Sequence, residues 1–177
     1  MMKAKTKIVL DADVIIHFIK GGQLSLLLNI FPEYQYLILD VVYEEVTINK
    51  ATKTQIDNTI AFMPKRVSCV KFAPKGESRM EYARLRSSML LGKGESACMI
   101  YCKDNQDVLG SSNLKDISRY CIEHHITYLT TIDFLYYAFI RKLMTKVDVE
   151  IFIKDVIAKG SKLPVVDIER YSPTAMI

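Results

Sequence analysis

Four acidic residues stand far apart in the sequence, each near the end of an expected strand or the start of an expected helix. They are Asp11, Glu45, Glu95 and Asp116. In an open parallel sheet, ligands bind at the rim formed by the carboxyl ends of the strands. Converging carboxylates suit a hard cation such as Mg²⁺ or Mn²⁺, which prefers oxygen ligands and can activate water for phosphodiester hydrolysis. The four acids therefore predict a metal-assisted hydrolytic site.

The sharpest of these signals is Asp11. The apolar run 7–10 is typical of a short buried strand, and it leads through Asp11-Ala12-Asp13 into the helical pattern of 14–19. Asp13 is a second possible oxygen donor beside the first. A purely structural alternative is that Asp11 caps the helix that follows.

Each of the other acids also has a structural alternative. Glu45 would be an ordinary solvated helix residue, and Glu44 beside it is an equal candidate for the site. Glu95 opens a helix, where the macrodipole favours a negative charge with or without a metal. Asp116 follows Asn113 by three residues, a spacing that resembles a helix capping box with Asp in place of Glu.

Strand-like and helix-like segments alternate along the chain, with no repeat or low-complexity linker. Strands are expected at 7–10, 36–39, 66–72, 107–110 and 126–129, and helices at 14–19, 23–31, after Asp40, and at 51–62, 77–91, 95–103, 114–124, 131–144 and 147–158. This order predicts a three-layer α/β fold with a mostly parallel central sheet flanked by helices. The length of 177 residues, half of them hydrophobic, predicts one domain spanning residues 1–177.

Composition narrows the class of protein. The formal net charge of +4 permits a polyanionic partner without demanding one. Polar residues interrupt the early apolar stretch, which argues against a membrane span, and four cysteines without an expected signal peptide predict a cytoplasmic protein. Cys98 and Cys102 share a helix face and would bind zinc if Cys121, His124 or His125 approached; buried free thiols are the alternative.

Four short motifs occur in an order that carries a family resemblance. They are Leu10-Asp11-Ala12-Asp13-Val14-Ile15-Ile16, Val42-Tyr43-Glu44-Glu45-Val46, Gly94-Glu95-Ser96-Ala97 and Ser111-Ser112-Asn113. Over about residues 7–145 the chain resembles PIN-domain ribonucleases, including VapC-type toxins; residues 146–177 form a further helix and tail. The resemblance implies a Rossmann-like fold, one or two Mg²⁺ or Mn²⁺ ions, hydrolysis of single-stranded RNA and an antitoxin partner. It assigns the first three acidic positions to Asp11, Glu45 and Glu95.

The fourth motif departs from the family pattern. Asn113 stands where family members commonly have an aspartate, and its amide oxygen can ligate a cation but brings no charge. Asp116, one helical turn on, could supply the missing carboxylate. Asp13 replaces a small polar residue and is another possible ligand. The departure keeps open a catalytically weakened PIN-like module that binds RNA or protein.

The first motif has a second resemblance. Asp11-Ala12-Asp13-Val14 is similar to the nucleophile motif of haloacid-dehalogenase phosphatases, in which the first aspartate is phosphorylated and the second acts as acid and base. That class also has a late pair of metal-binding aspartates, and the sequence between Leu109 and Asp155 has no matching loop. A metal-dependent ribonuclease is the leading hypothesis.

Basic residues near the acids are candidates for RNA contacts. They are Arg79, Arg84, Arg86 and Lys93 before Glu95, and Lys115 and Arg119 beside Asp116. The alternative is a mixed-charge solvated helix, because Glu77 and Glu81 lie among them. The apolar run 134–140 is interpreted as core, with homodimerisation as the alternative.

Overall fold

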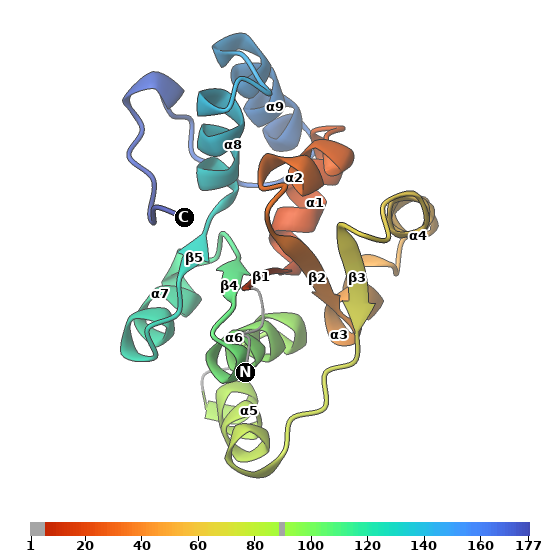
Figure 1. Cartoon of the computed structure of the whole chain (residues 1–177), viewed down its shortest axis with the longest axis vertical. Helices are drawn as coiled ribbons and strands as arrows, with labels where there is room; N and C mark the ends of the chain where they lie inside the picture. The colour runs from red at the N-terminus through yellow and green to blue at the C-terminus, as the bar shows by residue number, and fades with distance from the viewer. Residues whose placement is uncertain (1–5, 89–90) are drawn as a thin grey trace.

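The computed structural model describes residues 6–88 and 91–177, and these form a central sheet covered by helices (Figure 1). The strands are β1 (Lys7–Leu10), β2 (Gln35–Leu39), β3 (Val67–Val70), β4 (Val108–Gly110) and β5 (Tyr128–Leu129). Their order across the sheet is β3-β2-β1-β4-β5, and every neighbouring pair is parallel. The carboxyl ends of β1 and β4 therefore lie side by side at the centre of one rim.

Helices lie on both sides of this sheet, which gives the three layers expected from the sequence. They are α1 (Ala12–Lys20), α2 (Leu24–Ile30), α3 (Asp40–Val46), α4 (Lys50–Phe62), α5 (Gly76–Ser88), α6 (Lys93–Asn105), α7 (Leu114–Glu123), α8 (Thr131–Ile140) and α9 (Lys146–Ala158), followed by a short 3₁₀ turn, η1 (Ile168–Arg170). In Figure 1, α2, α8 and α9 gather on one side of the strands, and α3, α5 and α6 on the other.

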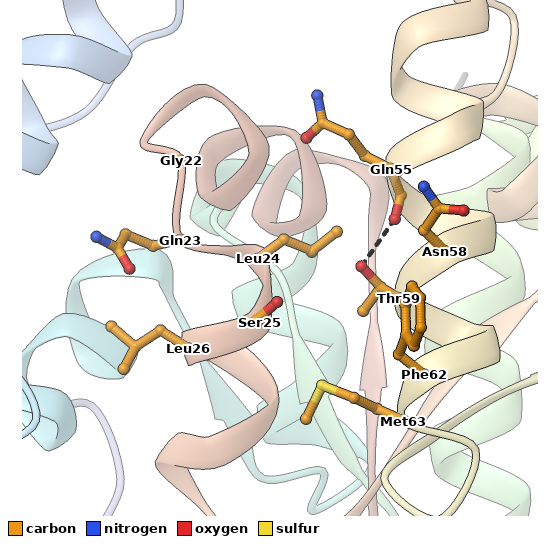
Figure 2. A pocket seen from close by; sticks show the side chains of 10 residues that line it. All are labelled: Gly22, Gln23, Leu24, Ser25, Leu26, Gln55, Asn58, Thr59, Phe62 and Met63. Atoms are coloured by element: carbon orange, nitrogen blue, oxygen red, sulfur yellow. Dashed lines mark hydrogen bonds between the residues drawn. The ribbon is translucent and has the colours of Figure 1, made fainter.

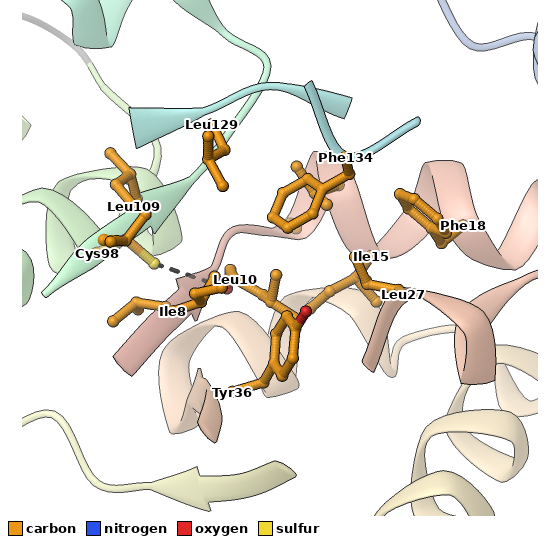
Figure 3. Close-up of a cluster of buried hydrophobic side chains, with 14 of the residues drawn as sticks. Ile8, Leu10, Ile15, Phe18, Leu27, Tyr36, Cys98, Leu109, Leu129 and Phe134 are labelled. Carbon is orange, nitrogen blue, oxygen red and sulfur yellow. Dashed lines mark hydrogen bonds between the residues drawn. The ribbon is translucent and has the colours of Figure 1, made fainter. Parts of the chain in front are cut away.

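The central strands are buried on both faces, because helices cover each side. In β1 and β2 nearly every side chain is inaccessible, which explains why the sequence of both reads as a continuous apolar run. Figure 3 shows Ile8 and Leu10 of β1 packed between Cys98 of α6 and Tyr36 of β2. Within the described residues, no helix has both the length and the apolar character that crossing a membrane requires.

Aromatic packing holds the C-terminal helices against the first helix. Phe18 of α1 lies edge-on to Phe134 of α8, with ring centroids 6.2 Å apart, and 5.0 Å from the ring of Phe152 of α9. These rings are fully or almost fully buried. The apolar run 134–140 therefore contributes to the core, although Ile140 at its end is exposed.

Several helices and strands are shorter than the sequence predicts. The helix expected to reach residue 144 ends at Ile140, because the chain turns there through Lys142 at φ 60°, and the N–H groups of Leu143 and Met144 donate to the carbonyl of Ala138. The strands expected at 66–72 and 126–129 shorten to 67–70 and 128–129. Of the helix expected at 77–91, residues 89–90 lie outside the described residues and Leu91 is not helical.

Candidate active site

An acidic cleft of about 290 Å³ opens at the carboxyl ends of β1 and β4. Its lining contains all four acids singled out in the sequence together with the two further candidates, namely Asp11, Asp13, Glu45, Glu95, Asn113 and Asp116, beside Ala12, Leu91 and Gly92. They come from the start of α1 and the residue before it, from α3, from the start of α6 and the two residues before it, and from the start of α7 and the residue before it. The fold thus brings together side chains that are about a hundred positions apart in the chain.

Asp11 has a capping contact and a cleft contact at once. The Ala12 N–H donates to Oδ1 at 2.8 Å, which caps α1, and the Ser111 hydroxyl donates to Oδ2 at 3.1 Å. The Asp11 N–H donates to the carbonyl of Gly110 at the end of β4. Asp11 is only 5% exposed. The capping role considered for this residue is therefore present without removing it from the cleft.

Gly94 allows the start of α6 to approach the acids closely. A Cβ atom at this position would lie 2.9 Å from Oε2 of Glu45, 3.1 Å from Cγ2 of Val42 and 3.6 Å from Oδ1 of Asp11. Glu45 and Asp11 therefore both face the backbone of α6 at Gly94, and Glu44 is not part of the cleft lining. Of the two glutamates considered, Glu45 lines the cleft, and its role beside a metal stays a prediction. Sequence reasoning did not assign a site role to Gly94, although a glycine in the first turn of a helix was a usable signal.

Asn113 links two of the acids. Its side-chain Nδ2 donates to Oε1 of Glu95 at 2.8 Å and to Oδ2 of Asp116 at 2.7 Å. Asn113 occupies the N-cap position of α7, but its side chain makes no capping hydrogen bond. The capping box considered as the structural alternative for Asp116 is therefore absent, because the Asn113 amide group bridges two carboxylates instead.

Asp13 faces the loop that follows β4. The Val14 N–H donates to Oδ1 at 2.6 Å, and the Ser112 N–H donates to Oδ2 at 2.7 Å. No sequence pattern predicts this contact between Asp13 and Ser112, which are 99 residues apart.

The crowded acids hold their protons more tightly than free carboxyl groups do. Burial raises the pKa of Asp11 to about 8, and the nearby charges of Asp13 and Glu95 add to the increase. Burial also raises the pKa of Glu95 to about 7, with further increases from Asp116 and Asp13 and an opposing effect of the Asn113 hydrogen bond. The pKa of Asp13 is raised by burial as well. A bound cation would relieve this repulsion, since an opposite charge favours the ionised forms.

The donor chemistry of the cleft fits a hard cation. All its candidate ligand atoms are oxygens, the type preferred by Mg²⁺ and Mn²⁺, and the glycine at position 94 leaves space beside two of the carboxylates. In residues 6–88 and 91–177, no three His, Cys, Asp or Glu side chains form a preassembled metal-binding group. Backbone N–H groups and the Asn113 amide hold several of the carboxylates instead. Metal binding would thus require these side chains to rearrange.

The cysteine cluster considered for zinc is part of the core. Cys98, Cys102 and Cys121 are buried free thiols, and burial raises the pKa of each. His124 lies instead 3.5 Å from a carboxylate oxygen of Glu81. The described residues thus give no support to zinc binding here.

The six basic candidates lie outside the described lining of the cleft. Arg79, Arg84, Lys93 and Lys115 are exposed. Two others have protein partners: the Arg86 guanidinium donates to the carbonyl of Leu91 at 2.7 Å, and Arg119 forms an ion pair with Glu123 at 2.9 Å.

A second hollow, of about 350 Å³, lies between α2 and α4 (Figure 2). Its described lining contains glutamine, asparagine, serine, threonine and apolar side chains, with no charged group. Thr59 uses its hydroxyl to donate to the carbonyl of Gln55, one turn earlier in α4. This hollow lacks the acids and bases of hydrolytic chemistry, so the acidic cleft is the candidate active site.

Two chains from solved structures match this chain at low sequence identity. A chain of the crystal structure of VapBC2 from Rickettsia felis, bound to a DNA fragment from their promoter, matches with a TM-score of 0.51 and 14% identity, over 71% of this chain and 98% of that chain. A chain of VapBC-1 from nontypeable Haemophilus influenzae has 15% identity over 71% of this chain and 98% of its own, with a TM-score of 0.49. No protein-family model and no curated protein sequence matches the chain. The VapBC2 likeness confirms the expected PIN-type α/β fold.

Proposed function

We propose that this protein is a metal-dependent endoribonuclease that hydrolyses single-stranded RNA. The observation that carries the proposal is the meeting of Asp11, Glu45 and Glu95 in one cleft, from three separate elements of the fold. Such a set of oxygen donors is suited to holding a cation, and the cation would neutralise the charge of a phosphodiester and activate water. The fold shared with the VapBC2 chain supports the same assignment.

In this proposal Asp11, Glu95 and Asp116 hold Mg²⁺ or Mn²⁺, with the carbonyl oxygen of Asn113 as a neutral ligand. The bound ion supplies charge neutralisation and a water of lowered pKa. Asp11 is oriented by the Ser111 hydroxyl, so one of its oxygens keeps a fixed direction. Glu45 is exposed and faces the same space, where its Oε2 is available to accept a proton from the attacking water.

The proposal extends to the substrate, the partners and the location of the protein. Four exposed basic residues, Arg79, Arg84, Lys93 and Lys115, would contact the phosphates of the RNA. The proposal includes an antitoxin partner, because the matching Rickettsia structure is a VapBC complex, and it allows a homodimer. A cytoplasmic location suits the four free cysteines.

One observation favours a second candidate, a PIN-like module that binds RNA or protein without catalysis. The Asn113 amide already provides hydrogen-bond donors to Glu95 and Asp116, so it partly compensates the charges that a metal would otherwise neutralise. Measuring Mn²⁺ binding separates the two functions, because the catalytically inactive module would show no saturable binding.

The decisive experiment is RNA cleavage by the purified protein with Mn²⁺ and with EDTA. We expect products carrying a 5′-phosphate only when the metal is present, and a loss of about a hundredfold or more in Asp11→Asn and Glu95→Gln. Glu44→Gln is the matched control, since Glu44 neighbours Glu45 but does not line the cleft. Cleavage that persists in EDTA would contradict the proposal.

The same variants separate catalysis from folding. Asparagine is as good an N-cap as aspartate, so Asp11→Asn keeps the start of α1. Removing one of several crowded carboxylates relieves repulsion, and the melting temperature of each variant should be unchanged or higher without metal. A large loss of stability in both would mean that the acids serve the fold rather than a metal.

A further inference from the structure

The carboxylate of Asp13 differs from its neighbours in what it contacts. Both of its oxygens accept hydrogen bonds from backbone N–H groups, one from Val14 and one from Ser112. Burial raises the pKa of Asp13, and the backbone N–H groups of Ser112, Val14 and Asn113 oppose this rise, as expected for donors close to the charged group. Asp11 also has both oxygens hydrogen-bonded, but Oδ2 of Asp11 accepts from the Ser111 hydroxyl, which can rotate away. The backbone N–H donors of Asp13 cannot turn aside in this way, so Asp13 is the less suited of the two to ligate a cation.

A chain of side-chain hydrogen bonds continues behind the loop. The Ser112 hydroxyl donates to Oγ1 of Thr131 at 2.8 Å and accepts from the Thr131 N–H at 2.8 Å. Oγ1 of Thr131 lies 2.8 Å from Nδ1 of His17 in α1. Thr131 is fully buried and His17 is 6% exposed. Burial lowers the pKa of His17 to about 4, so the ring is neutral near pH 7 and its Nδ1 can accept the threonine proton.

The two flanking residues of the loop carry the contacts to the other acids. Ser111, on one side of Ser112, donates to Asp11, and Asn113, on the other side, donates to Glu95 and Asp116. Fixing Ser112 therefore fixes both neighbours. Two hydrogen bonds hold Ser112: its N–H donates to the Asp13 carboxylate, and its hydroxyl donates to the Thr131 hydroxyl.

Thr131 is the first residue of α8, and further hydrogen bonds hold the start of this helix in place. Thr130 and Asp133 form a capping box at the start of α8. Asp133 also accepts from the hydroxyl of Tyr171 at 2.9 Å and from the N–H of Thr174 at 2.7 Å. The C-terminal tail thereby holds the helix start against which the loop is positioned.

We propose that Asp13 is a positioning residue rather than a metal ligand. It acts with Ser112, Thr131 and His17 to hold the 111–113 loop in the orientation that presents the acidic cleft. The metal-binding part of this inference rests on the proposed function; the positioning part does not.

The first test measures Mn²⁺ affinity by calorimetry in Asp13→Asn, Thr131→Val and the double variant, with Asp11→Asn beside them. Losing one positioning hydrogen bond should weaken binding about fivefold in each single variant. Because both act through Ser112, the double variant should be about fivefold to tenfold weaker, well short of the roughly 25-fold expected from independent sites. Thr131→Ser, which keeps the hydroxyl, should restore the parent affinity.

If Asp13 is itself a metal ligand, the same measurements give a different result. Asp13→Asn would then abolish binding as Asp11→Asn does, while Thr131→Val would leave it unchanged, and this outcome would overturn the proposal. Thr127→Val is the matched control, because Thr127 is exposed and lies just before β5. It should leave Mn²⁺ affinity at the parent value.

The second test needs no metal. We expect the Ser112 amide to be protected from hydrogen exchange in the parent and to exchange about tenfold faster or more in Asp13→Asn and Thr131→Val. If the parent binds no Mn²⁺, the proposed function fails and this measurement alone decides the positioning role. Unchanged protection of Ser112 in both variants would overturn that role.

Discussion

Replacing Asn113 by aspartate changes the one position in the cleft where an amide separates two acids. In the metal-free protein the substitution removes two donor contacts, to Glu95 at 2.8 Å and to Asp116 at 2.7 Å, and adds a third negative charge. Each hydrogen bond contributes about 0.5–1 kcal/mol at such a partly solvated site, so the loss is about 1–2 kcal/mol. For a chain of this size, that lowers the melting temperature by roughly 2–8 °C.

Adding Mn²⁺ should reverse most of this loss, because the new carboxylate becomes a charged ligand. A tenfold gain in affinity corresponds to about 1.4 kcal/mol. At a metal concentration that saturates both proteins, the same difference appears as added stability of the variant, since a ligand that binds only the folded state stabilises it. The deficit in melting temperature should therefore shrink to within about 2 °C of the parent.

The assay is thermal unfolding of parent and variant in EDTA and in saturating Mn²⁺, with calorimetry for the affinity. Asn58→Asp is the matched control, because Asn58 is exposed on α4 and lines the uncharged hollow away from the acids. It should show the same small change in both conditions. If Asn113→Asp showed an equal deficit with and without Mn²⁺ and an unchanged affinity, residue 113 would not reach the metal.

Three further outcomes follow from the cleft. Gly94→Ala should change the free energy of unfolding by less than about 2 kcal/mol, because a gain of about 1 kcal/mol in helix propensity opposes the crowding of Glu45. It should nevertheless lower Mn²⁺ affinity and RNA cleavage together. An alanine variant that binds metal and cleaves RNA would refute the idea that the close approach of α6 is essential. In EDTA, urea unfolding should show stability falling as pH rises from about 4 to 8, because Asp11 and Glu95, with raised pKa values, hold protons in the folded state that the unfolded chain has released. Asp11→Asn should make that decline shallower, and a stability that rises with pH over this range would contradict the assigned direction.

The sequence alone determined the framework of the protein. Short apolar runs such as 36–39, separated by helical patterns, were enough to predict the parallel three-layer fold, because buried parallel strands require apolar residues on both faces. Asp11 and Glu95 could also be selected from local patterns, because Asp11 follows a strand and Glu95 opens a helix. Local chain order therefore sets the position of each on the rim of the sheet. The end of α8 was missed because its apolar pattern continues beyond Ile140, where the turn begins.

Only the tertiary structure decided how the side chains at this rim are used. The packing of α3 against α6 places Glu45 in the cleft lining, whereas Glu44 is not part of it. The Asn113 amide donates to two carboxylates instead of capping α7. The connection from Asp13 through Ser112 to Thr131 joins segments that have no local relation in the sequence. Strand and helix patterns record which residues face the core, whereas hydrogen bonds between distant loops depend on orientations that exist only once the sheet has assembled.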